Sequence, residues 1–446
     1  MDETSFIFLS NDLENNQLIQ ACREGDQSIV ALLIDRGADI NTTDNNGNTP
    51  FSLSCYFGYI DIVNLLIDNG CDINKPENNG MTPLIIACEI GLLPIVARLI
   101  ERVADINTTD NDGNTPFTLS CEYDNINIAN LLMDKGCDIL KPNNNGMTPL
   151  MNACVRGHLS IVVRLIERGA DINTTAKNGK TPFSFSCEYG YIDKVNLLID
   201  KGCDIHKPDN NGMTPLIIAC VGGYMSIVVG LISRGADINT TDNVGNTPFS
   251  LSCENGFINI VNLLIDEDCD INNHKNNGMA PLMIACFLGL LPIVIRLIER
   301  GADINITDND GNTPFSFSCE YGDIDIVNLL IDKGCDIHKP DNNGITPLMI
   351  ACVRGHLPIV ARLIERGSDI NITDKNGETS FTWASKGGYN DIVNLLSDKV
   401  SDENKPYDVG KPPLAKDCNN KDLVIDDGTG IQTHDRNVTG MWQTLA

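Results

Sequence analysis

The residues of this chain whose types and spacing could support chemistry are its cysteines, its histidines and one glycine-rich segment. The sequence of 446 residues contains 17 cysteines and six histidines. Cysteines at CxxC spacing would indicate a metal site, and a cysteine with a histidine could form a nucleophile and its base. No CxxC pair occurs in the sequence. The distribution of the cysteines must therefore decide their role.

The cysteines follow a fixed period. Eleven occur at steps of 33 residues from Cys22 to Cys352, and five more occur at steps of 66 residues from Cys71 to Cys335. The first set stands in predicted helices, where cysteine acts as a small apolar residue. We therefore predict packing rather than disulfides or metal ligation, with no metal and no cofactor. Many free thiols also favour a reducing compartment, so we expect the protein in the cytoplasm.

The histidines repeat in the same way. His158 and His356 occupy one slot of the period, and His206 and His338 share another. A unique catalytic residue would stand outside the period. We therefore expect a non-catalytic protein.

A segment near the C-terminus offers an alternative. Residues 423–430 read Leu-Val-Ile-Asp-Asp-Gly-Thr-Gly and resemble the first phosphate-binding loop of actin-like ATPases. A glycine-rich loop after an apolar strand can offer backbone N–H groups to phosphate. That family needs several hundred further residues to build its cleft. A nucleotide-dependent or enzymatic role through this tail is the alternative to a non-catalytic role.

The elements that position these residues begin at Thr-Pro dipeptides, which recur at steps of 33 residues or multiples of 33 from Thr49 to Thr346. Threonine is a favoured N-cap, and proline suits the first helical position, so each dipeptide predicts the start of a short helix. A later glycine, such as Gly91, permits the positive φ that ends this helix. A second helix follows, and the polar run 41–47 predicts a turn-rich, hairpin-like link to the next repeat.

These motifs resemble those of the ankyrin-repeat family. The chain has Thr-Pro-Leu-Ile-Ile-Ala at 82–87 and Gly-Ala-Asp-Ile-Asn at 169–173, and the resemblance covers residues 12–402. It implies an all-α repeat solenoid of about twelve stacked ankyrin repeats in a curved superhelical array. The family's histidine after Thr-Pro-Leu is replaced by residues such as Ile85 and Met151, or by serine or threonine. This replacement predicts the loss of a side-chain hydrogen bond.

The repeats at the two ends depart from the pattern, as capping repeats of a solenoid do. Residues 12–44 lack Thr-Pro, and the last repeat has Ser380 in place of the proline. The sequence therefore predicts five regions: a flexible N-terminus over 1–11, an N-terminal capping repeat over 12–44, ten repeats over 45–375, a C-terminal capping repeat over 376–402, and a disordered tail over 403–446.

The repeats alternate between two types, one with Thr-Pro-Phe and one with Met-Thr-Pro-Leu, so the duplicated unit has 66 residues. A multivalent scaffold could use such spacing, because avidity accumulates over identical sites. Recent duplication without functional demand explains the alternation equally well. Asn-x-Thr triplets, first at Asn41, also follow this period. We interpret them as part of the link rather than as glycosylation sites.

The charge of the chain limits its partners. It has 32 basic and 60 acidic residues, a formal net charge of −28. Such a surface repels nucleic-acid phosphates and anionic lipid heads, and it favours partner proteins with basic surfaces. The apolar stretch 84–100 is interrupted by Glu89, Gly91, Pro94 and Arg98, so we expect no membrane insertion. We expect a monomer.

The resemblance implies that partner proteins bind on a concave face made of hairpin tips and of the exposed side of the first helices. Tyrosine and arginine are common interface anchors, and exposed methionine adapts to varied apolar partners. The candidate residues follow the helix cysteines or stand at the tips: Tyr56, Phe57, Glu122, Tyr123, Arg156, Glu188, Tyr189, Glu320, Tyr321, Arg354, Met81, Met147, Met213 and Met279.

The expected function is therefore a non-catalytic protein–protein interaction scaffold. Two further interpretations stay open. The candidate residues could merely cover helix ends, because singly exposed apolar residues need no function. The array could also serve as a mechanical spacer without a specific ligand.

Overall fold

The structure is a computed structural model that describes residues 3–402, with side chains for residues 12–399. Within residues 3–402 it contains 24 helices and no strand. An isolated β-bridge in this range joins Thr373 to Thr379. The all-α repeat architecture predicted from the sequence is confirmed.

The helices alternate between the first and the second helix of a repeat. The first helices are α1 (Glu3–Glu24), α3 (Pro50–Phe57), α5 (Pro83–Ile90), α7 (Pro116–Glu122), α9 (Pro149–Arg156), α11 (Pro182–Glu188), α13 (Pro215–Val221), α15 (Pro248–Glu254), α17 (Pro281–Phe287), α19 (Pro314–Tyr321), α21 (Pro347–Arg354) and α23 (Ser380–Gly387). The second helices are α2 (Gln27–Asp35), α4 (Ile60–Asp68), α6 (Leu93–Glu101), α8 (Ile126–Asp134), α10 (Leu159–Glu167), α12 (Ile192–Asp200), α14 (Met225–Ile232), α16 (Ile258–Asp266), α18 (Leu291–Glu299), α20 (Ile324–Asp332), α22 (Leu357–Glu365) and α24 (Asn390–Asp402).

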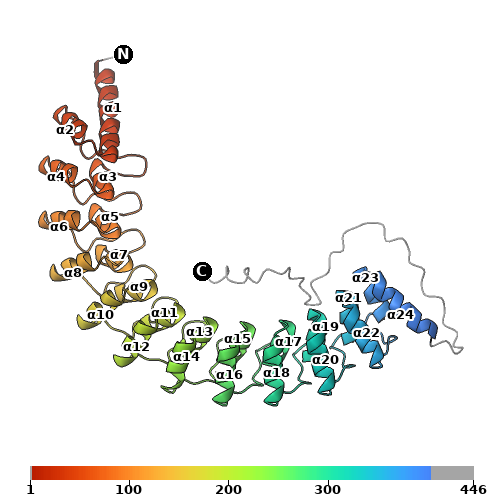
Figure 1. Cartoon of the computed structure of the whole chain (residues 1–446). Helices are drawn as coiled ribbons and strands as arrows, with labels where there is room; N and C mark the ends of the chain where they lie inside the picture. The colour runs from red at the N-terminus through yellow and green to blue at the C-terminus, as the bar shows by residue number, and fades with distance from the viewer. Residues whose placement is uncertain (1–2, 403–446) are drawn as a thin grey trace. The chain divides into compact units, whose positions relative to one another are not determined.

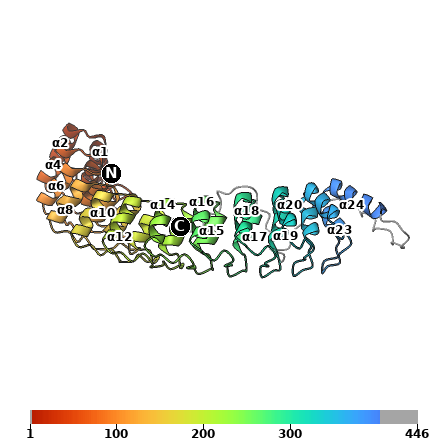
Figure 2. The ribbon, with the colours of Figure 1, turned by 60° about the horizontal axis from the view of Figure 1, so that its bottom comes forward.

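The helices of the compact unit over residues 1–394 form two layers. From α1 and α2 through to α21 and α22, each first helix contacts the second helix of its own repeat. Successive first helices contact one another, and so do successive second helices. Figure 1 shows the odd-numbered helices from α1 to α21 along one side of the row and the even-numbered helices from α2 to α22 along the other, and Figure 2 shows the same row turned by 60°. Each repeat is therefore stabilised mainly by its nearest neighbours.

A capping hydrogen bond sets the start of a typical first helix, and a residue with positive φ sets its end. In α3, the Thr49 hydroxyl accepts a hydrogen bond from the Ser52 backbone N–H at 2.9 Å, and Pro50 is the first helical residue. At the other end, Gly58 has φ of 81° and caps the helix. The predictions for Thr-Pro and for the helix-ending glycine are both confirmed.

The slot of the family's histidine behaves differently in the two repeat types. In the Thr-Pro-Phe type, Ser52 Oγ accepts a hydrogen bond from the Thr49 N–H at 3.0 Å, and Ser250 does the same for Thr247 at 2.9 Å. A side-chain hydrogen bond is therefore present in these repeats, contrary to our expectation. In the Thr-Pro-Leu type the slot holds a fully buried apolar residue such as Ile85.

The two ends refine the predicted boundaries. α1 begins at Glu3, so residues 3–11, which we expected to form a separate flexible segment, continue the first helix. Extension of a formed helix adds one hydrogen bond per residue, which favours this continuation. Of the second compact unit, residues 395–446, the structure describes 395–402, the end of α24. The predicted tail 403–446 and its glycine-rich segment 423–430 lie outside the described residues.

The core alternates along the array as the sequence does. Among the largest fully buried side chains are five phenylalanines at 66-residue steps: Phe51, Phe117, Phe183, Phe249 and Phe315. In the intervening repeats the same slot holds buried leucines, such as Leu216 and Leu282. The first-helix cysteines from Cys22 to Cys352 are likewise buried, at 0% exposed.

The first-helix cysteines are buried, as their period predicted. Those in the described residues are free thiols. Burial raises the pKa of Cys22 to about 11 and that of Cys154 to about 12. Their thiols are therefore protonated at neutral pH, and a protonated thiol is neither a nucleophile nor a metal ligand.

Two hydrogen-bond ladders of asparagine join consecutive links. At the turns, the Asn243 side-chain amide donates to the Asn210 carbonyl at 2.9 Å, and Asn210 donates to the Lys177 carbonyl at 2.8 Å. Closer to the second helices, Asn239 Oδ1 accepts the Asp270 backbone N–H at 2.9 Å. The same contact recurs at Asn41, Asn107, Asn173 and Asn305. The Asn-x-Thr asparagines thus have a structural role in the repeat junction.

Among the described residues, three that are not glycine have positive φ. Val103 has φ of 64°, Asp124 of 60° and Asp268 of 57°. They occupy slots that hold glycine in other repeats, such as Gly169 with φ of 86°. Aspartate tolerates this region better than a β-branched residue does. Val103 is therefore the most strained of the three.

Replacing Val103 by glycine is expected to raise the free energy of unfolding by about 1 kcal/mol. The left-handed conformation costs an L-residue about 1–2 kcal/mol, while glycine loses up to about 1 kcal/mol more chain entropy on folding. Val103 is 84% exposed, so the substitution removes little packing. Urea denaturation would measure the change. A matched exposed substitution, Val244→Gly, should not stabilise the protein, and equal effects at both sites would contradict the strain.

Lys194 occupies a buried position that other second helices fill with Ile62, Ile128, Ile260 or Ile326. The lysine is only 4% exposed. Its Nζ donates to the Gly157 carbonyl at 2.9 Å and lies 3.8 Å from the centre of the Tyr191 ring. Burial lowers the pKa of Lys194. The charged form is therefore less favourable in the folded chain than in water.

Replacing Lys194 by isoleucine is expected to stabilise the fold by about 1 kcal/mol near neutral pH. The folded-state pKa lies below the unfolded value of about 10.4, so the desolvation penalty is fully present below the folded pKa. As pH rises from the folded pKa towards the unfolded value, the folded protein releases the proton first and the penalty disappears. Urea denaturation near neutral pH and near the unfolded pKa should show a shrinking advantage of the variant. A difference in free energy of unfolding that stays the same at both pH values would contradict desolvation of the charged lysine as the cause.

Candidate protein-binding surface

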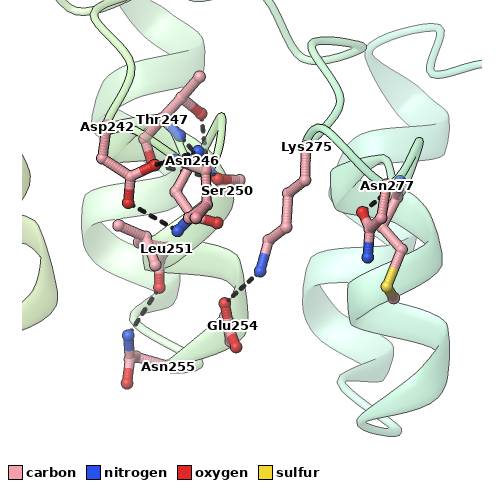
Figure 3. A network of polar contacts seen from close by, with 11 residues as sticks. Asp242, Asn246, Thr247, Ser250, Leu251, Glu254, Asn255, Lys275 and Asn277 are labelled. Atoms are coloured by element: carbon pink, nitrogen blue, oxygen red, sulfur yellow. Dashed lines mark hydrogen bonds and ion pairs between the residues drawn. The ribbon is translucent and has the colours of Figure 1, made fainter. Parts of the chain in front are cut away.

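The repeat built on α15 shows how a candidate side chain is positioned (Figure 3). In the preceding link, the Asp242 carboxylate accepts hydrogen bonds from the Asn246 backbone N–H and side-chain amide, each at 2.7 Å. The link delivers the chain to Thr247, which caps α15. At the far end of the helix, Glu254 forms an ion pair of 2.8 Å with Lys275 from the next link.

The predicted aromatic residues lie at the C-terminal ends of first helices and are exposed. The exposed fractions are 55% for Tyr56, 43% for Phe57, 47% for Tyr123, 46% for Tyr189 and 51% for Tyr321. We call these positions and the charged positions that follow the helix cysteines the first-helix surface: Tyr56, Phe57, Glu122, Tyr123, Arg156, Glu188, Tyr189, Glu320, Tyr321 and Arg354.

The charged candidates of this surface pair with residues of the chain itself. Arg156 binds Glu122 of the preceding repeat at 2.6 Å, and Arg354 binds Glu320 in the same register. The Glu188 carboxylate forms an ion pair with Lys180 Nζ at 2.7 Å. These glutamates are only partly exposed. Their charge is therefore largely compensated before any partner arrives.

The histidines support the ends of these helices. His158 Nε2 donates to the Glu122 carbonyl at 2.8 Å, and His356 Nε2 donates to the Glu320 carbonyl at 3.0 Å. Each histidine belongs to the repeat that follows the carbonyl. They fix the helix ends that carry Tyr123 and Tyr321, which is a structural role at equivalent positions of the period.

The four methionines at the hairpin tips are less available than we expected. Met81, Met147, Met213 and Met279 are half-buried rather than exposed. Their backbone N–H groups are held by the link, as where Met213 donates to Asp209 Oδ1 at 3.0 Å. The outer positions of most turns hold polar residues such as Asn210 and Asn211. One repeat later the slot of Asn211 holds Val244, which is 58% exposed.

Two apolar residues outside the predicted set belong to the same surface. Ile90 is 42% exposed and Phe287 is 39% exposed. Ile90 stands 33 residues after Phe57, and Phe287 stands 33 residues before Glu320. Their place in the period was the signal that could have identified them.

A family model described as "Ankyrin repeats (3 copies)" matches the chain in seven overlapping stretches: residues 18–110, 72–143, 89–176, 173–242, 223–308, 249–341 and 315–407. Together the matches cover most of the sequence. The chain belongs to the ankyrin-repeat family. No curated protein matched it. Ankyrin repeats generally serve as protein–protein interaction modules, and ankyrin-repeat proteins are typically non-catalytic.

In the part of this ankyrin-repeat chain whose side chains are described, no group of three or more His, Cys, Asp or Glu residues could hold a metal ion. None of the described helices combines the length and the apolar character that a bilayer crossing requires. The first-helix surface is the candidate functional site of the described residues.

Proposed function

We propose that this ankyrin-repeat protein is a non-catalytic scaffold that holds partner proteins on its first-helix surface, the concave side of the array. One observation carries the proposal. Tyr123, Tyr189 and Tyr321 stand at equivalent positions in Thr-Pro-Phe repeats, and each is about half exposed. Tyrosine combines a large apolar ring with a hydroxyl, which makes it a frequent interface anchor.

The charge of the chain supports a choice of partner and compartment. A formal charge of −28 favours partners with basic surfaces and disfavours nucleic acids. Free thiols throughout the core suit a reducing compartment such as the cytoplasm. We propose that the protein acts there as a monomer and needs no cofactor.

The triple variant Tyr123→Ala/Tyr189→Ala/Tyr321→Ala tests the proposal. Affinity capture from the native cell with mass spectrometry should find partners on the full chain, and the variant should lose them by about tenfold or more. The matched control is Val229→Ala/Ile295→Ala, because these residues are 43% and 39% exposed on second helices. Unchanged capture by the triple variant would contradict the proposal and favour a spacer.

Deleting residues 403–446 tests the alternative role of the tail. Under our proposal the truncated chain captures the same partners as the full chain. Loss of capture on truncation would move the function to the tail.

A further inference from the structure

Acidic side chains are compensated unevenly along the first-helix surface. From α7 onwards, Glu122, Glu188, Glu254 and Glu320 each form an ion pair with an arginine or lysine of the chain. Nearer the N-terminus, Glu77 and Glu89 form no ion pair with any residue whose side chain the structure describes. Both are only partly exposed. A charge that is partly removed from water gains more from an added cation than a fully exposed charge does.

Exposed apolar side chains gather in the same repeats. Tyr56, Phe57, Ile90 and Tyr123 are 55%, 43%, 42% and 47% exposed. They lie at the ends of α3, α5 and α7, which contact one another in sequence. The Tyr56 and Phe57 rings meet edge to face at 5.0 Å, and Phe57 stacks on Tyr59 at 6.0 Å. These contacts hold the rings in place before a ligand binds, which lowers the entropy lost on binding.

The Glu77 carboxylate lies against α3, the helix that carries Tyr56, where it forms a hydrogen bond with Ser52. Two pairs of side chains separated by 21 residues, one on a first helix and one in the following link, are in contact: Arg23 with Asp44 at 3.3 Å, and Glu254 with Lys275 at 2.8 Å. Glu77 follows Tyr56 by the same 21 residues. Burial raises the pKa of Glu77, the hydrogen bond with Ser52 opposes this shift, and the charge of Asp44 adds to it. No lysine or arginine side chain that the structure describes forms an ion pair with this carboxylate.

Glu89 lies beside Tyr123. Burial raises the pKa of the Tyr123 hydroxyl, and the negative charge of Glu89 contributes to the shift along with that of Glu122. Arg156 compensates Glu122 but forms no ion pair with Glu89. Tyr123 and Ile90 are thus flanked by a carboxylate that forms a hydrogen bond with the Tyr123 hydroxyl and that pairs with no described lysine or arginine side chain.

We propose that these residues, the N-terminal patch (Tyr56, Phe57, Glu77, Glu89, Ile90 and Tyr123), bind a partner segment in which lysine or arginine is flanked by apolar side chains. The apolar side chains pack on the rings and on Ile90, and the cation binds Glu77 or Glu89 and the tyrosine faces. The chain already contains such a contact, since Lys194 Nζ lies 3.8 Å from the centre of the Tyr191 ring. This inference rests on the proposed protein-binding function and adds the chemistry of the partner.

A random dodecapeptide library displayed on phage and selected on the full chain tests the inference. Enriched peptides should contain lysine or arginine next to Leu, Ile, Phe or Trp. Fluorescence anisotropy should then show about tenfold weaker binding of these peptides to Glu77→Gln/Glu89→Gln, and likewise to Ile90→Ala. The control Asp134→Asn/Asp266→Asn removes the same charge from ion-paired carboxylates on second helices and should change affinity by less than about threefold. Circular dichroism melting checks that each variant is folded.

Several results would overturn the inference. Enriched peptides without basic residues would do so, and so would equal weakening by the two charge variants, which would indicate net charge alone. A dimer in sedimentation velocity that Ile90→Ala dissociates would show that a second copy occupies the patch. If Tyr189→Ala/Tyr321→Ala abolishes peptide binding while the patch variants do not, the inference fails and the proposed function stands. If no variant of the first-helix surface affects binding, both fail.

Discussion

Replacing Phe249 by alanine should lower the free energy of unfolding by about 3–5 kcal/mol. Phe249 is 1% exposed and belongs to the series of phenylalanines that fills the core of alternate repeats. Alanine would leave a cavity that the rigid helix pair α15 and α16 closes only in part. Because each repeat is stabilised by its neighbours, hydrogen exchange should speed up first in these two helices and in the repeats beside them.

Phe287→Ala is the matched control for this prediction. Phe287 is 39% exposed, and it meets Phe317 edge to face at 5.7 Å. Losing that contact should cost about 1 kcal/mol. Urea denaturation measures both variants, although a repeat array can unfold in steps, so hydrogen exchange should accompany it. Equal losses from Phe249→Ala and Phe287→Ala would contradict the alternating core described above.

Replacing Gly179 by alanine should cost about 2–5 kcal/mol, because two penalties combine. Gly179 has φ of 83°, and a left-handed conformation costs alanine about 1–2 kcal/mol. A Cβ atom there would also lie 2.6 Å from the Asn210 backbone nitrogen of the next link. Asn210 donates its N–H to the Asn178 carbonyl at 3.0 Å, so relief of this clash would break the junction. Overpacking of this kind costs about 1–3 kcal/mol more.

Gly202→Ala separates the two penalties. Gly202 has φ of 81°, but a Cβ atom there would meet nothing within 4 Å. The free energy of unfolding of this variant should therefore fall only by the cost of the backbone conformation, about 1–2 kcal/mol. Thermal or urea denaturation of both variants gives the comparison. If both variants lose the same free energy of unfolding, the clash with the next link does not contribute to the loss at Gly179.

Ion pairs between consecutive second helices occur at four junctions where a Thr-Pro-Phe repeat meets the repeat that follows it. Aspartate of the former binds arginine of the latter: Asp68 with Arg102, Asp134 with Arg168, Asp266 with Arg300 and Asp332 with Arg366. Such exposed pairs contribute little stability each. Their position nevertheless makes the 66-residue unit a property of the repeat junctions as well as of the sequence.

The fold could be predicted from the sequence because the signals that specify it are local. The Thr49 cap acts on Ser52, three residues away, and Gly58 ends the same helix through its own φ. Repetition of these signals at a fixed period left one architecture. The burial of the cysteines followed from the same period, because a position that repeats in every helix must have the same environment in every repeat.

Contacts between repeats could not be predicted in this way, because they depend on how far side chains reach across the junction. Equivalent glutamates pair with basic side chains at different sequence separations. Glu188 pairs with Lys180 of its own repeat, Glu254 with Lys275 of the next link, and Glu122 with Arg156 of the next first helix. The half-burial of the tip methionines and the burial of Lys194 also depend on stacking. The sequence by itself determined the helices, their caps and the exposed tyrosines. Only the tertiary structure decided which charges are compensated, because this depends on distances between residues far apart in the chain.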